Sequence, residues 1–364
     1  MRTEKLGKNG KLRKAVKIIA IVLAAIILLP IITLLIGRGV NDIRARLPGG
    51  IREKGYIKLG GIEQYINIRG ADTSNPVIIF LHGGPGGPTS YILPSQQSVE
   101  TDYTFIYWDQ RGSGRSYIKS PYTEISFDIL LNDLDELVDY ATERFCQPII
   151  IVGHSWGTLL GIIYAQEHPD KIVGYIGMGQ VVSEFEAQRL SSTEAARLAR
   201  EAENEQDALE IETLFQEFYN EPVSDNNYAG RLNSAQYEYL PFPIRDVTIP
   251  ALLSPDFGWD NLRWELSLGF DIYECFNAME PLFRAVYEKT PPDDISIPVV
   301  FINGSLDYST PSILVQEYAE RLTAPKKEVF ILQGFGHVLF EDPMDKDLEV
   351  FSETLRKALA IVLE

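Results

Sequence analysis

Residues 149–158 read IIIVGHSWGT, and this stretch decides how the chain folds. Its first four residues are β-branched, which predicts a buried strand, and the apolar run after Gly157 predicts a helix. Between them stands the pattern G-x-S-x-G, a strand-to-helix turn so tight that only small residues fit two positions before and after the serine. Such a turn holds the serine in a strained conformation with its hydroxyl exposed. We therefore predict that Ser155 is a nucleophile at the end of a central strand.

Short β-branched runs and helical segments continue to alternate on both sides of this turn. Strands that alternate with helices form an open, mostly parallel sheet with helices on both faces, so the predicted fold class is α/β. The core of this fold is predicted at 55–180 and 296–364. The predicted strands are two at 56–68, joined by a Gly60-Gly61 turn, and one each at 76–81, 103–107, 149–152, 172–176, 297–302 and 328–332; the helices are at 126–144, 157–167, 312–322 and 345–363.

The alternation stops between residues 181 and 295, which predicts a mainly helical cap over the ends of the strands. This block holds 23 acidic and eight basic side chains, and the whole chain has a formal net charge of −18. Two interpretations of the acids stay open: they keep a helical surface soluble, or they give the cap surroundings that differ from those of the N-terminus. The negative charge argues against nucleic acid as a partner.

The N-terminus combines a basic tail with an apolar segment. Residues 1–17 carry seven Lys or Arg and one Glu, and residues 18–36 contain no charged side chain. A helix of that length spans most of the ~30 Å hydrocarbon core of a bilayer, so 18–36 is predicted to be a retained, single-pass transmembrane anchor. The basic tail predicts a cytoplasmic N-terminus and a folded domain outside the cytoplasm, joined to the anchor by a linker at 37–54. The alternative is a cleaved signal peptide, whose apolar region is usually shorter.

A serine hydroxyl needs a base beside it at neutral pH, and the chain has four histidines. His154 adjoins the serine, so its side chain should point away from the nucleophile. His168 stands where a helix ends at a proline, which suits the surface, and His82 lies beside glycines, which suits loop shaping. Elimination leaves His337, directly after the last predicted strand, as the base.

In folds with this turn the partners follow the serine in the order acid, then base. Asp307 follows the predicted strand at 297–302 through a short loop and precedes His337. A carboxylate there holds the imidazole in the correct tautomer and stabilises the imidazolium without taking the proton itself. The alternative interpretation of Asp307 is a turn aspartate with no catalytic role.

Three motifs, in this order, resemble the proline iminopeptidases (prolyl aminopeptidases) of the α/β-hydrolase superfamily. They are HGGPG at 82–86, WDQRGSGRS at 108–116 and GHSWG at 153–157. The resemblance runs from about residue 56 to the C-terminus and is weak in the cap. It implies an α/β-hydrolase fold, a serine aminopeptidase activity, and structural roles for Asp109 and Arg111. It also implies that the N–H of Gly84 joins that of Trp156, the residue after the nucleophile, in an oxyanion hole.

The chain departs from this family in two loops. Residues 304–307 read GSLD where the family more often has Gly-Arg-Tyr-Asp, and His154 replaces a glycine found in many members. Neither change removes a catalytic atom. In the family, acidic cap residues bind the free α-amine of the substrate, and Glu184 and Glu186 are the candidates nearest the core. No motif assigns either residue to that role.

Three functions stay open. The first is an aminopeptidase that releases N-terminal residues, proline among them, from short peptides through an acyl-enzyme. The second is an esterase or other acyl hydrolase with the same triad, and the third is a non-catalytic module displayed on a membrane. Nothing in the sequence indicates a metal or an organic cofactor. The two cysteines, Cys146 and Cys275, form no zinc pattern and are predicted to be buried thiols rather than a disulfide.

Overall fold

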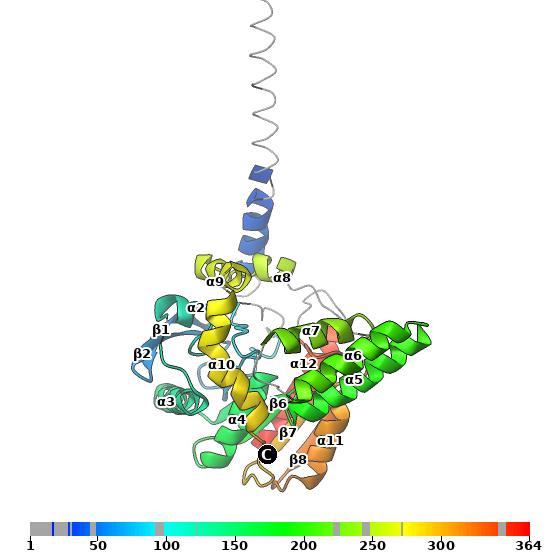
Figure 1. Cartoon of the computed structure of the whole chain (residues 1–364). Coiled ribbons are helices and arrows are strands. Elements are labelled where there is room, and N and C mark those ends of the chain that lie inside the picture. The colour runs from blue at the N-terminus through cyan, green and yellow to red at the C-terminus, as the bar shows by residue number, and fades with distance from the viewer. Residues whose placement is uncertain are drawn as a thin grey trace, which may run out of the picture.

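The structure is a computed structural model of the chain (Figure 1). It describes residues 17, 28–29, 31–43, 49–91, 98–121, 123–220, 226–241, 248–270, 272–340 and 347–364. An eight-stranded sheet in the order β1-β2-β4-β3-β5-β6-β7-β8 forms its centre. The strands are β1 (Ile51–Leu59), β2 (Ile62–Gly70), β3 (Val77–Leu81), β4 (Thr104–Trp108), β5 (Ile149–His154), β6 (Gly174–Met178), β7 (Val299–Gly304) and β8 (Lys327–Leu332).

The directions of the strands determine where their carboxyl ends lie. β1 pairs with β2, and β2 with β4, in antiparallel register. The remaining neighbours, from β4 through β3 to β8, are all parallel. The loops after β3, β5, β7 and β8 therefore leave the same edge of the sheet, where ligands bind in open α/β sheets.

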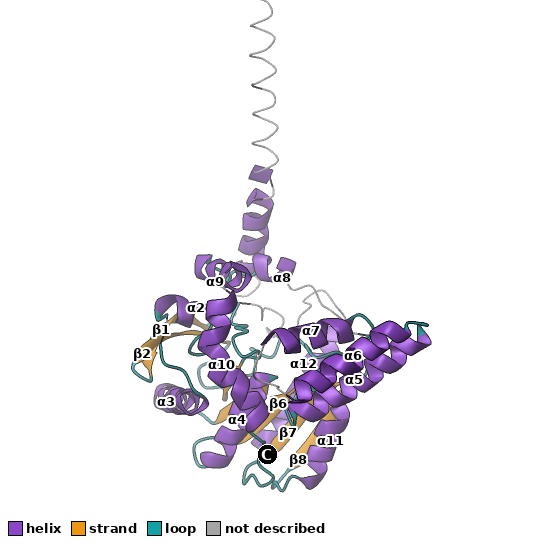
Figure 2. Cartoon of the chain, viewed as in Figure 1, coloured by secondary structure: helices purple, strands orange, loops and turns teal. Residues whose placement is uncertain are grey.

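Helices cover both faces of the sheet (Figure 2). On one face, α3 (Phe127–Phe145), α4 (Trp156–Glu167) and α11 (Ser312–Arg321) pack against the strands in one apolar cluster. On the other face, α12 (Asp347–Leu363) packs through Phe351, Leu355 and Leu359 against a second cluster. Residues buried on both faces explain why β3 and β5 are continuous apolar runs rather than alternating ones.

The predicted α/β class and mostly parallel sheet are confirmed, and most predicted elements lie within two residues of the observed ones. The β1–β2 hairpin turns at Gly60 and Gly61 as predicted, but β1 begins at Ile51, earlier than expected. The helix α2 (Gly114–Lys119) was not predicted. Its glycines and serines indicate a loop, and the helix forms because buried Asp109 accepts the N–H of Arg115 at 3.0 Å.

Between β6 and β7 the described chain forms helices that we call the helical insert. The helices α5 and α6 run side by side and project from the domain (Figure 1), packed through small side chains such as Ala195 and Ala208. The division of the chain into cap and core at 181 and 295 stays a prediction. The insert consists of α5 (Glu184–Glu201), α6 (Glu205–Asn220), α7 (Asn226–Tyr237), α8 (Thr248–Leu253), α9 (Trp259–Phe270) and α10 (Ile272–Glu288).

The N-terminal helix (residues 31–43) stands out from the domain above α8 and α9 (Figure 1). Its large apolar side chains are exposed, Leu35 by 59% and Ile36 by 62%. The predicted basic tail at 1–17 and most of the predicted anchor at 18–36 lie outside the described residues. Among the residues that are described, no helix has both the length and the apolar composition needed to cross a bilayer. Residues 37–43 are helical and 51–54 belong to β1, so much of the predicted linker is regular structure.

The cysteine at the end of α3 differs from the prediction. Cys146 is free and exposed, not buried, because it occupies the left-handed C-cap position with φ of 52°. The helix ends there, and the side chain leaves the apolar face that packs on the sheet. The side chain of Cys275 lies outside the described residues.

Candidate active site

The predicted nucleophile occupies a strained turn between β5 and α4. Ser155 has φ of 52° and ψ of −123°, a conformation that a non-glycine residue rarely adopts. A Cβ on Gly157 would lie 2.3 Å from the carbonyl oxygen of Leu81, and one on Gly153 would lie 2.5 Å from that of Gly157. The Ser155 N–H donates to the carbonyl of Met178 at 2.9 Å. The neighbouring backbone therefore leaves room only for glycine at positions 153 and 157. It also holds Ser155 at the carboxyl edge of the sheet.

The structure brings the predicted acid and base together. Nδ1 of His337 lies 3.0 Å and 3.1 Å from the two carboxylate oxygens of Asp307. Asp307 follows β7 and His337 follows β8, so adjacent parallel strands deliver both side chains to the same edge as Ser155. Because a carboxylate only accepts hydrogen bonds, Nδ1 carries the proton and Nε2 is left to act as a base.

The surroundings of Asp307 favour its ionised form. The carboxylate accepts the N–H of Ser309 at 3.0 Å, and both the N–H and the hydroxyl of Thr310 at 2.8 Å and 2.7 Å. Burial by itself would raise the pKa of Asp307, but the charge of His337 and these donors outweigh it and lower the pKa below its ordinary value. The negative charge that orients the imidazole is thus built into the loop.

His154 points toward the backbone of His337 rather than toward the nucleophile. Its Nε2 donates to the carbonyl of His337 at 3.1 Å, and the two rings lie 5.0 Å apart, centroid to centroid. Burial, and then the nearby His337, lower the pKa of His154 to about 3, so this ring is neutral at physiological pH. The ring of His154 therefore contacts the backbone of the predicted base in its neutral form.

The glycine loop after β3 passes directly beside the serine. A Cβ on Gly83 would lie 3.1 Å from the Cβ of Ser155. Gly84 has φ of 116°, and a Cβ there would lie 2.6 Å from the backbone nitrogen of Gly86, so only glycine fits. Trp156 is the first residue of α4, and its N–H has no acceptor within the helix. Of the two predicted oxyanion donors, Trp156 directly follows the nucleophile, and Gly84 follows Gly83 in the loop and lines the same cavity.

Gln110 joins this loop to the nucleophile turn. Its side-chain amide donates to the carbonyl of His82 at 3.2 Å, and its oxygen accepts the indole N–H of Trp156 at 3.0 Å. The Gln110 N–H donates to Nε2 of His82, so Nδ1 of that ring donates to the carbonyl of Gly83 at 2.8 Å. Burial lowers the pKa of His82 to about 4 and keeps it neutral. Gln110, in the stretch 108–116, therefore holds both the glycine loop and the turn that carries Ser155.

The other residues singled out from the sequence have structural contacts. Buried Arg111 pairs with buried Asp133 at 2.7 Å, which fits the structural role that the resemblance implies. His168 stacks on Tyr164 at the protein surface, as predicted. None of these side chains lines the cavity that contains Ser155.

A cavity of about 540 Å³ opens above the nucleophile. The core supplies one side of it through the turn, the glycine loop and the base, and the helical insert supplies the other through α5, α7 and α9. Apolar and aromatic side chains share the lining with polar ones. The lining includes the predicted site residues Gly84, Ser155, Trp156 and His337 from the core, and the acids Glu184 and Glu265 from the insert.

The two acidic candidates in α5 are placed differently. Glu184, the first residue of the helix, lines the cavity and accepts a hydrogen bond from Gln188 at 3.0 Å. Burial raises the pKa of Glu184, although Gln188 and His337 act in the opposite direction. The other candidate, Glu186, does not line the cavity: its side chain is half exposed and pairs with Arg189 at 2.8 Å. Two residues along a helix correspond to a turn of about 200°, which places the two acids on opposite faces.

Sequence reasoning missed a second acid in the cavity. Glu265 of α9 lines it next to Trp264, and the hydroxyl of Tyr91 donates to its carboxylate. We refer to Trp264 and Glu265 as the α9 wall. No local pattern distinguishes Glu265 from the other acids of the insert, and only the packing of α9 reveals it. Among the described residues, no group of three or more His, Cys, Asp or Glu side chains is arranged to hold a metal ion.

Comparison with known proteins places these features in context. The family model for the alpha/beta hydrolase fold matches residues 76–343. A probable aminopeptidase, YbaC of Bacillus subtilis, is 26% identical over 83% of this chain and 94% of its own length. The proline iminopeptidase of Saccharolobus solfataricus is 23% identical over 85% of this chain and 94% of its own length. These relatives confirm the resemblance predicted from the three motifs.

Solved structures share the fold. The proline iminopeptidase-related protein TTHA1809 from Thermus thermophilus superposes with a TM-score of 0.54 and 22% identity, covering 86% of this chain and 98% of that one. A bacterial membrane phospholipase A superposes with a TM-score of 0.58 and 15% identity, over 96% of this chain and 98% of that one. Both structures are similar to this chain in the arrangement of the sheet and helices.

Proposed function

This chain belongs to the α/β-hydrolase fold family, and from that premise we propose that it is a serine aminopeptidase that releases N-terminal residues, proline among them, from short peptides. The observation that carries the proposal is the content of one cavity. Ser155 and His337 share it with two carboxylates, Glu184 and Glu265, that belong to the helical insert. A nucleophile beside fixed negative charge suits a substrate whose scissile carbonyl lies next to a free, protonated amine.

The first half of the proposed reaction forms an acyl-enzyme. The hydroxyl of Ser155 attacks the carbonyl carbon of the first peptide bond while Nε2 of His337 accepts the proton. Asp307 holds the Nδ1–H and stabilises the imidazolium. The N–H groups of Gly84 and Trp156 donate to the oxyanion as it forms. Collapse of this intermediate breaks the C–N bond, and His337 gives its proton to the departing peptide amine.

The second half releases the amino acid. A water molecule takes the place of the departed peptide, His337 removes its proton, and the resulting hydroxide attacks the ester carbonyl. The same two backbone N–H groups stabilise the second oxyanion. Breakdown returns the proton from His337 to Ser155 and restores the free enzyme.

Recognition of the amine falls to the helical insert. Glu184 lies close enough to His337 for the charges to interact, so an ammonium beside it would also lie beside the scissile carbonyl. Glu265 lines the same cavity, and in this proposal it accepts a second N–H of that ammonium. Val181, Trp264 and Phe340 supply apolar lining that suits a pyrrolidine ring. In this role the helical insert acts as a cap. By closing one end of the cavity, it would admit only the first residue of a peptide.

We also propose that residues 18–36 anchor the chain in a membrane, with the N-terminus in the cytoplasm and the catalytic domain outside. The seven basic side chains of the tail and the uncharged segment support this topology. In the described part of that region, Leu28, Leu29 and Ile32 are exposed to between 47% and 61%, as expected for side chains that lipid would cover. Full-length protein should stay with the membrane pellet after alkaline carbonate, and recovery in the supernatant would refute the anchor.

The activity is tested with matched substrates. Full-length protein in detergent is assayed on proline and alanine arylamides, on the same arylamides with an acetylated amine, and on short acyl esters. We expect turnover of the free-amine arylamides and at least tenfold lower kcat/KM on the acetylated ones. Turnover of the esters with no turnover of any arylamide would identify an acyl hydrolase instead. Absence of fluorophosphonate labelling at Ser155 in folded protein would indicate a non-catalytic module.

A further inference from the structure

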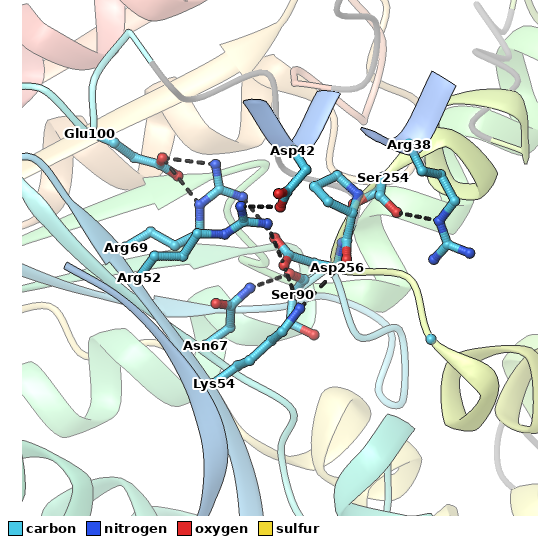
Figure 3. A network of polar contacts seen from close by, with 12 residues as sticks. Arg38, Asp42, Arg52, Lys54, Asn67, Arg69, Ser90, Glu100, Ser254 and Asp256 are labelled. Atoms are coloured by element: carbon cyan, nitrogen blue, oxygen red, sulfur yellow. Dashed lines mark hydrogen bonds and ion pairs between the residues drawn. The ribbon is translucent and has the colours of Figure 1, made fainter. Parts of the chain in front are cut away.

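A cluster of charged side chains lies at the loop between α8 and α9 (Figure 3), and none of its residues lines the cavity. Its centre is Asp256, in the loop between α8 and α9, with only 1% of the residue exposed. The side chains around it come from the end of the N-terminal helix, from β1 and β2, and from the turn that precedes β4 (Figure 3). Chain segments that are distant in sequence therefore meet at one carboxylate.

The Asp256 carboxylate has three cationic partners. Arg52 and Lys54 of β1 donate to Oδ1 at 3.0 Å and 3.1 Å, and Arg69 of β2 donates to Oδ2 at 3.1 Å. Burial opposes ionisation, but these charges lower the pKa of Asp256 below its ordinary value. The loop before α9 is thus attached to the edge of the central sheet by an ionised side chain.

The cluster is balanced in charge. Arg69, which is 3% exposed, also donates to Glu100 at 2.9 Å and 3.2 Å, and Glu100 accepts the hydroxyl of Tyr107 at 3.0 Å. The three cations face three carboxylates, those of Asp256, Glu100 and Asp42. Removal of the Asp256 carboxylate would leave Arg69 with Glu100 alone and Arg52 with Asp42 alone, so the buried positive charge would be less well compensated, which is unfavourable.

Asp256 connects this cluster to the lining of the cavity. The next residue, Phe257, packs edge-to-face on Tyr91 at 5.2 Å, and Tyr91 donates to Glu265. On the same side, Asn67 of β2 donates to the carbonyl of Ser90 at 3.1 Å, which holds the residue before Tyr91. Two residues of β2 therefore support the Tyr91–Glu265 pair. Asn67 holds the residue before Tyr91, and Arg69 holds the loop that carries Phe257.

Helix α9 itself begins at this loop. The guanidinium of Arg115 donates to the backbone carbonyl of Asp256, and a Cβ on Gly258 would lie 2.8 Å from that guanidinium. The Gly258 N–H donates to the side chain of Asn261 at 2.8 Å, in the first turn of the helix. The start of α9 is thus fixed in the first turn of the helix, N-terminal to the residues that line the cavity.

The N-terminal helix completes the arrangement from the other side. Arg38 donates to the carbonyl of Ser254 at 3.2 Å, and Asn41 donates to that of Leu253 at 3.1 Å, so both serve carbonyls at the end of α8. Asp42 accepts a hydrogen bond from Arg52 at 2.6 Å. Figure 3 shows Arg38 and Asp42 reaching the α8–α9 loop and its partners from this helix.

We propose that Asp256 is a positioning residue for substrate recognition: by fixing the α8–α9 loop to β1, β2 and the N-terminal helix, it sets the place of Glu265 in the cavity. The proposal rests on the proposed function, in which Glu265 binds the substrate amine. It assigns Asp256 no contact with substrate. Its loss is expected to weaken binding of the amine and to leave the chemistry at Ser155 largely intact.

The test uses full-length protein in detergent and three variants. Asp256→Asn keeps the shape of the side chain and removes its charge. Arg52→Gln removes a partner that is partly exposed and joins the loop to Asp42. Asp260→Asn is the matched control, because this acid lies four residues further on and is exposed in a pair with Arg263. The readouts are kcat and KM on proline arylamide, kcat/KM on a short acyl ester, and hydrogen exchange of residues 259–266.

We expect Asp256→Asn to raise KM on the arylamide about tenfold, with kcat changed by less than about threefold and ester turnover unchanged. Arg52→Gln should raise KM by a smaller factor, and Asp260→Asn should have no effect. Exchange in 259–266 should accelerate in the same order. Unchanged KM and exchange in Asp256→Asn, or an equal loss of kcat on both substrates, would overturn the proposal.

Two further outcomes are decisive. If Asp256→Asn does not fold, Arg52→Gln tests the proposal by the same readouts. Arg52 is partly exposed, and its replacement leaves Arg69 paired with Asp256 and Glu100. If the wild-type protein does not hydrolyse aminoacyl arylamides, the proposed function is refuted. The positioning role of Asp256 is then tested by hydrogen exchange alone. Faster exchange of 259–266 in Asp256→Asn than in Asp260→Asn would then support the positioning role, and equal exchange would refute it.

Discussion

The two sides of the cavity hold their functional groups by different means. At Ser155 the position comes from backbone contacts, since a side chain at Gly157 would collide with the carbonyl of Leu81. At Glu265 the position comes from side chains, through Tyr91 and a loop that Asp256 fastens to distant segments. The backbone at the Ser155 turn therefore leaves no space for an added side chain, whereas the position of Glu265 depends on residues that lie outside the cavity.

The strongest way to break this comparison is to remove the nucleophile. Ser155→Ala should lower kcat on proline arylamide by about 10⁵-fold, because proton transfer to His337 no longer produces a nucleophile. The amine-binding side is untouched, so affinity for a competitive amino-acid inhibitor should change by less than about threefold. Steady-state kinetics and fluorophosphonate labelling check this expectation. Ser234→Ala, on an exposed face of α7, is the control, and labelling that persists in Ser155→Ala would assign the nucleophile elsewhere.

The backbone side of the comparison is tested at Gly157. Gly157→Ala places a Cβ 2.3 Å from the Leu81 carbonyl oxygen, so the turn or β3 must shift. We expect kcat to fall about 100-fold and the free energy of unfolding to fall by about 3 kcal/mol. Denaturant unfolding and arylamide turnover measure the two effects. Gly230→Ala is the control, because a Cβ there meets no atom within 4 Å, and equal behaviour of both variants would contradict a backbone-limited turn.

The recognition side is tested at Glu184. Glu184→Gln should raise KM on proline arylamide about 20-fold, equivalent to about 1.8 kcal/mol, because a charged partner of the ammonium becomes neutral. Ester turnover should stay within twofold of wild type, since an ester carries no amine. Glu186→Gln offers a control two residues away on the exposed face of the same helix. Equal effects of the two substitutions would remove Glu184 from the amine site.

The pH dependence sharpens the same contrast. Burial raises the pKa of Glu184, so on acidification this carboxyl loses its charge earlier than an ordinary glutamate. The attraction for the ammonium is present above that pKa and is lost as the pH falls through it. KM on proline arylamide should therefore rise on acidification, starting at a higher pH than the titration of an ordinary glutamate would give, while KM on a short ester stays flat. A flat profile for the arylamide, or the same rise in Glu184→Gln, would contradict this assignment.

The smallest effect is expected at His154. His154→Phe keeps an aromatic ring but removes the donor to the His337 carbonyl, which should lower kcat about fivefold, or roughly 1 kcal/mol. Because the pKa of His154 is about 3, the ring is already neutral where the enzyme works, and the shape of the kcat profile against pH should not change. A displaced limb of that profile would show that His154 takes part in proton transfer.

Local patterns in the sequence predict the core well. The strands, the turn at Ser155 and the chain order of Asp307 and His337 each depend on a few adjacent residues, such as a β-branched run beside glycines. The structure brings these segments to one edge of the sheet. The catalytic roles of the three side chains remain predictions, and Ser155→Ala tests the first of them.

The helical insert shows where such reasoning ends. Glu184 and Glu186 look equivalent in the sequence, and only the start of α5 at Glu184 separates the inward face from the outward one. Glu265 depends on contacts with Tyr91 and with the loop around Asp256, and no spacing within α9 reflects them. Ion pairs between residues about 200 positions apart, such as Arg52 and Asp256, leave no periodic signal that could reveal them.

The N-terminal helix has a consequence for where the folded unit begins. A Cβ on Gly37 would lie 2.6 Å from the side chain of Leu253, so the helix approaches α8 closely, and Arg38 and Asn41 serve carbonyls at the end of α8. A fragment that starts at β1 would lose both donors and open that helix end to water. The minimal catalytic unit therefore includes residues upstream of the sheet, and truncations meant to yield a soluble enzyme should begin before Gly37.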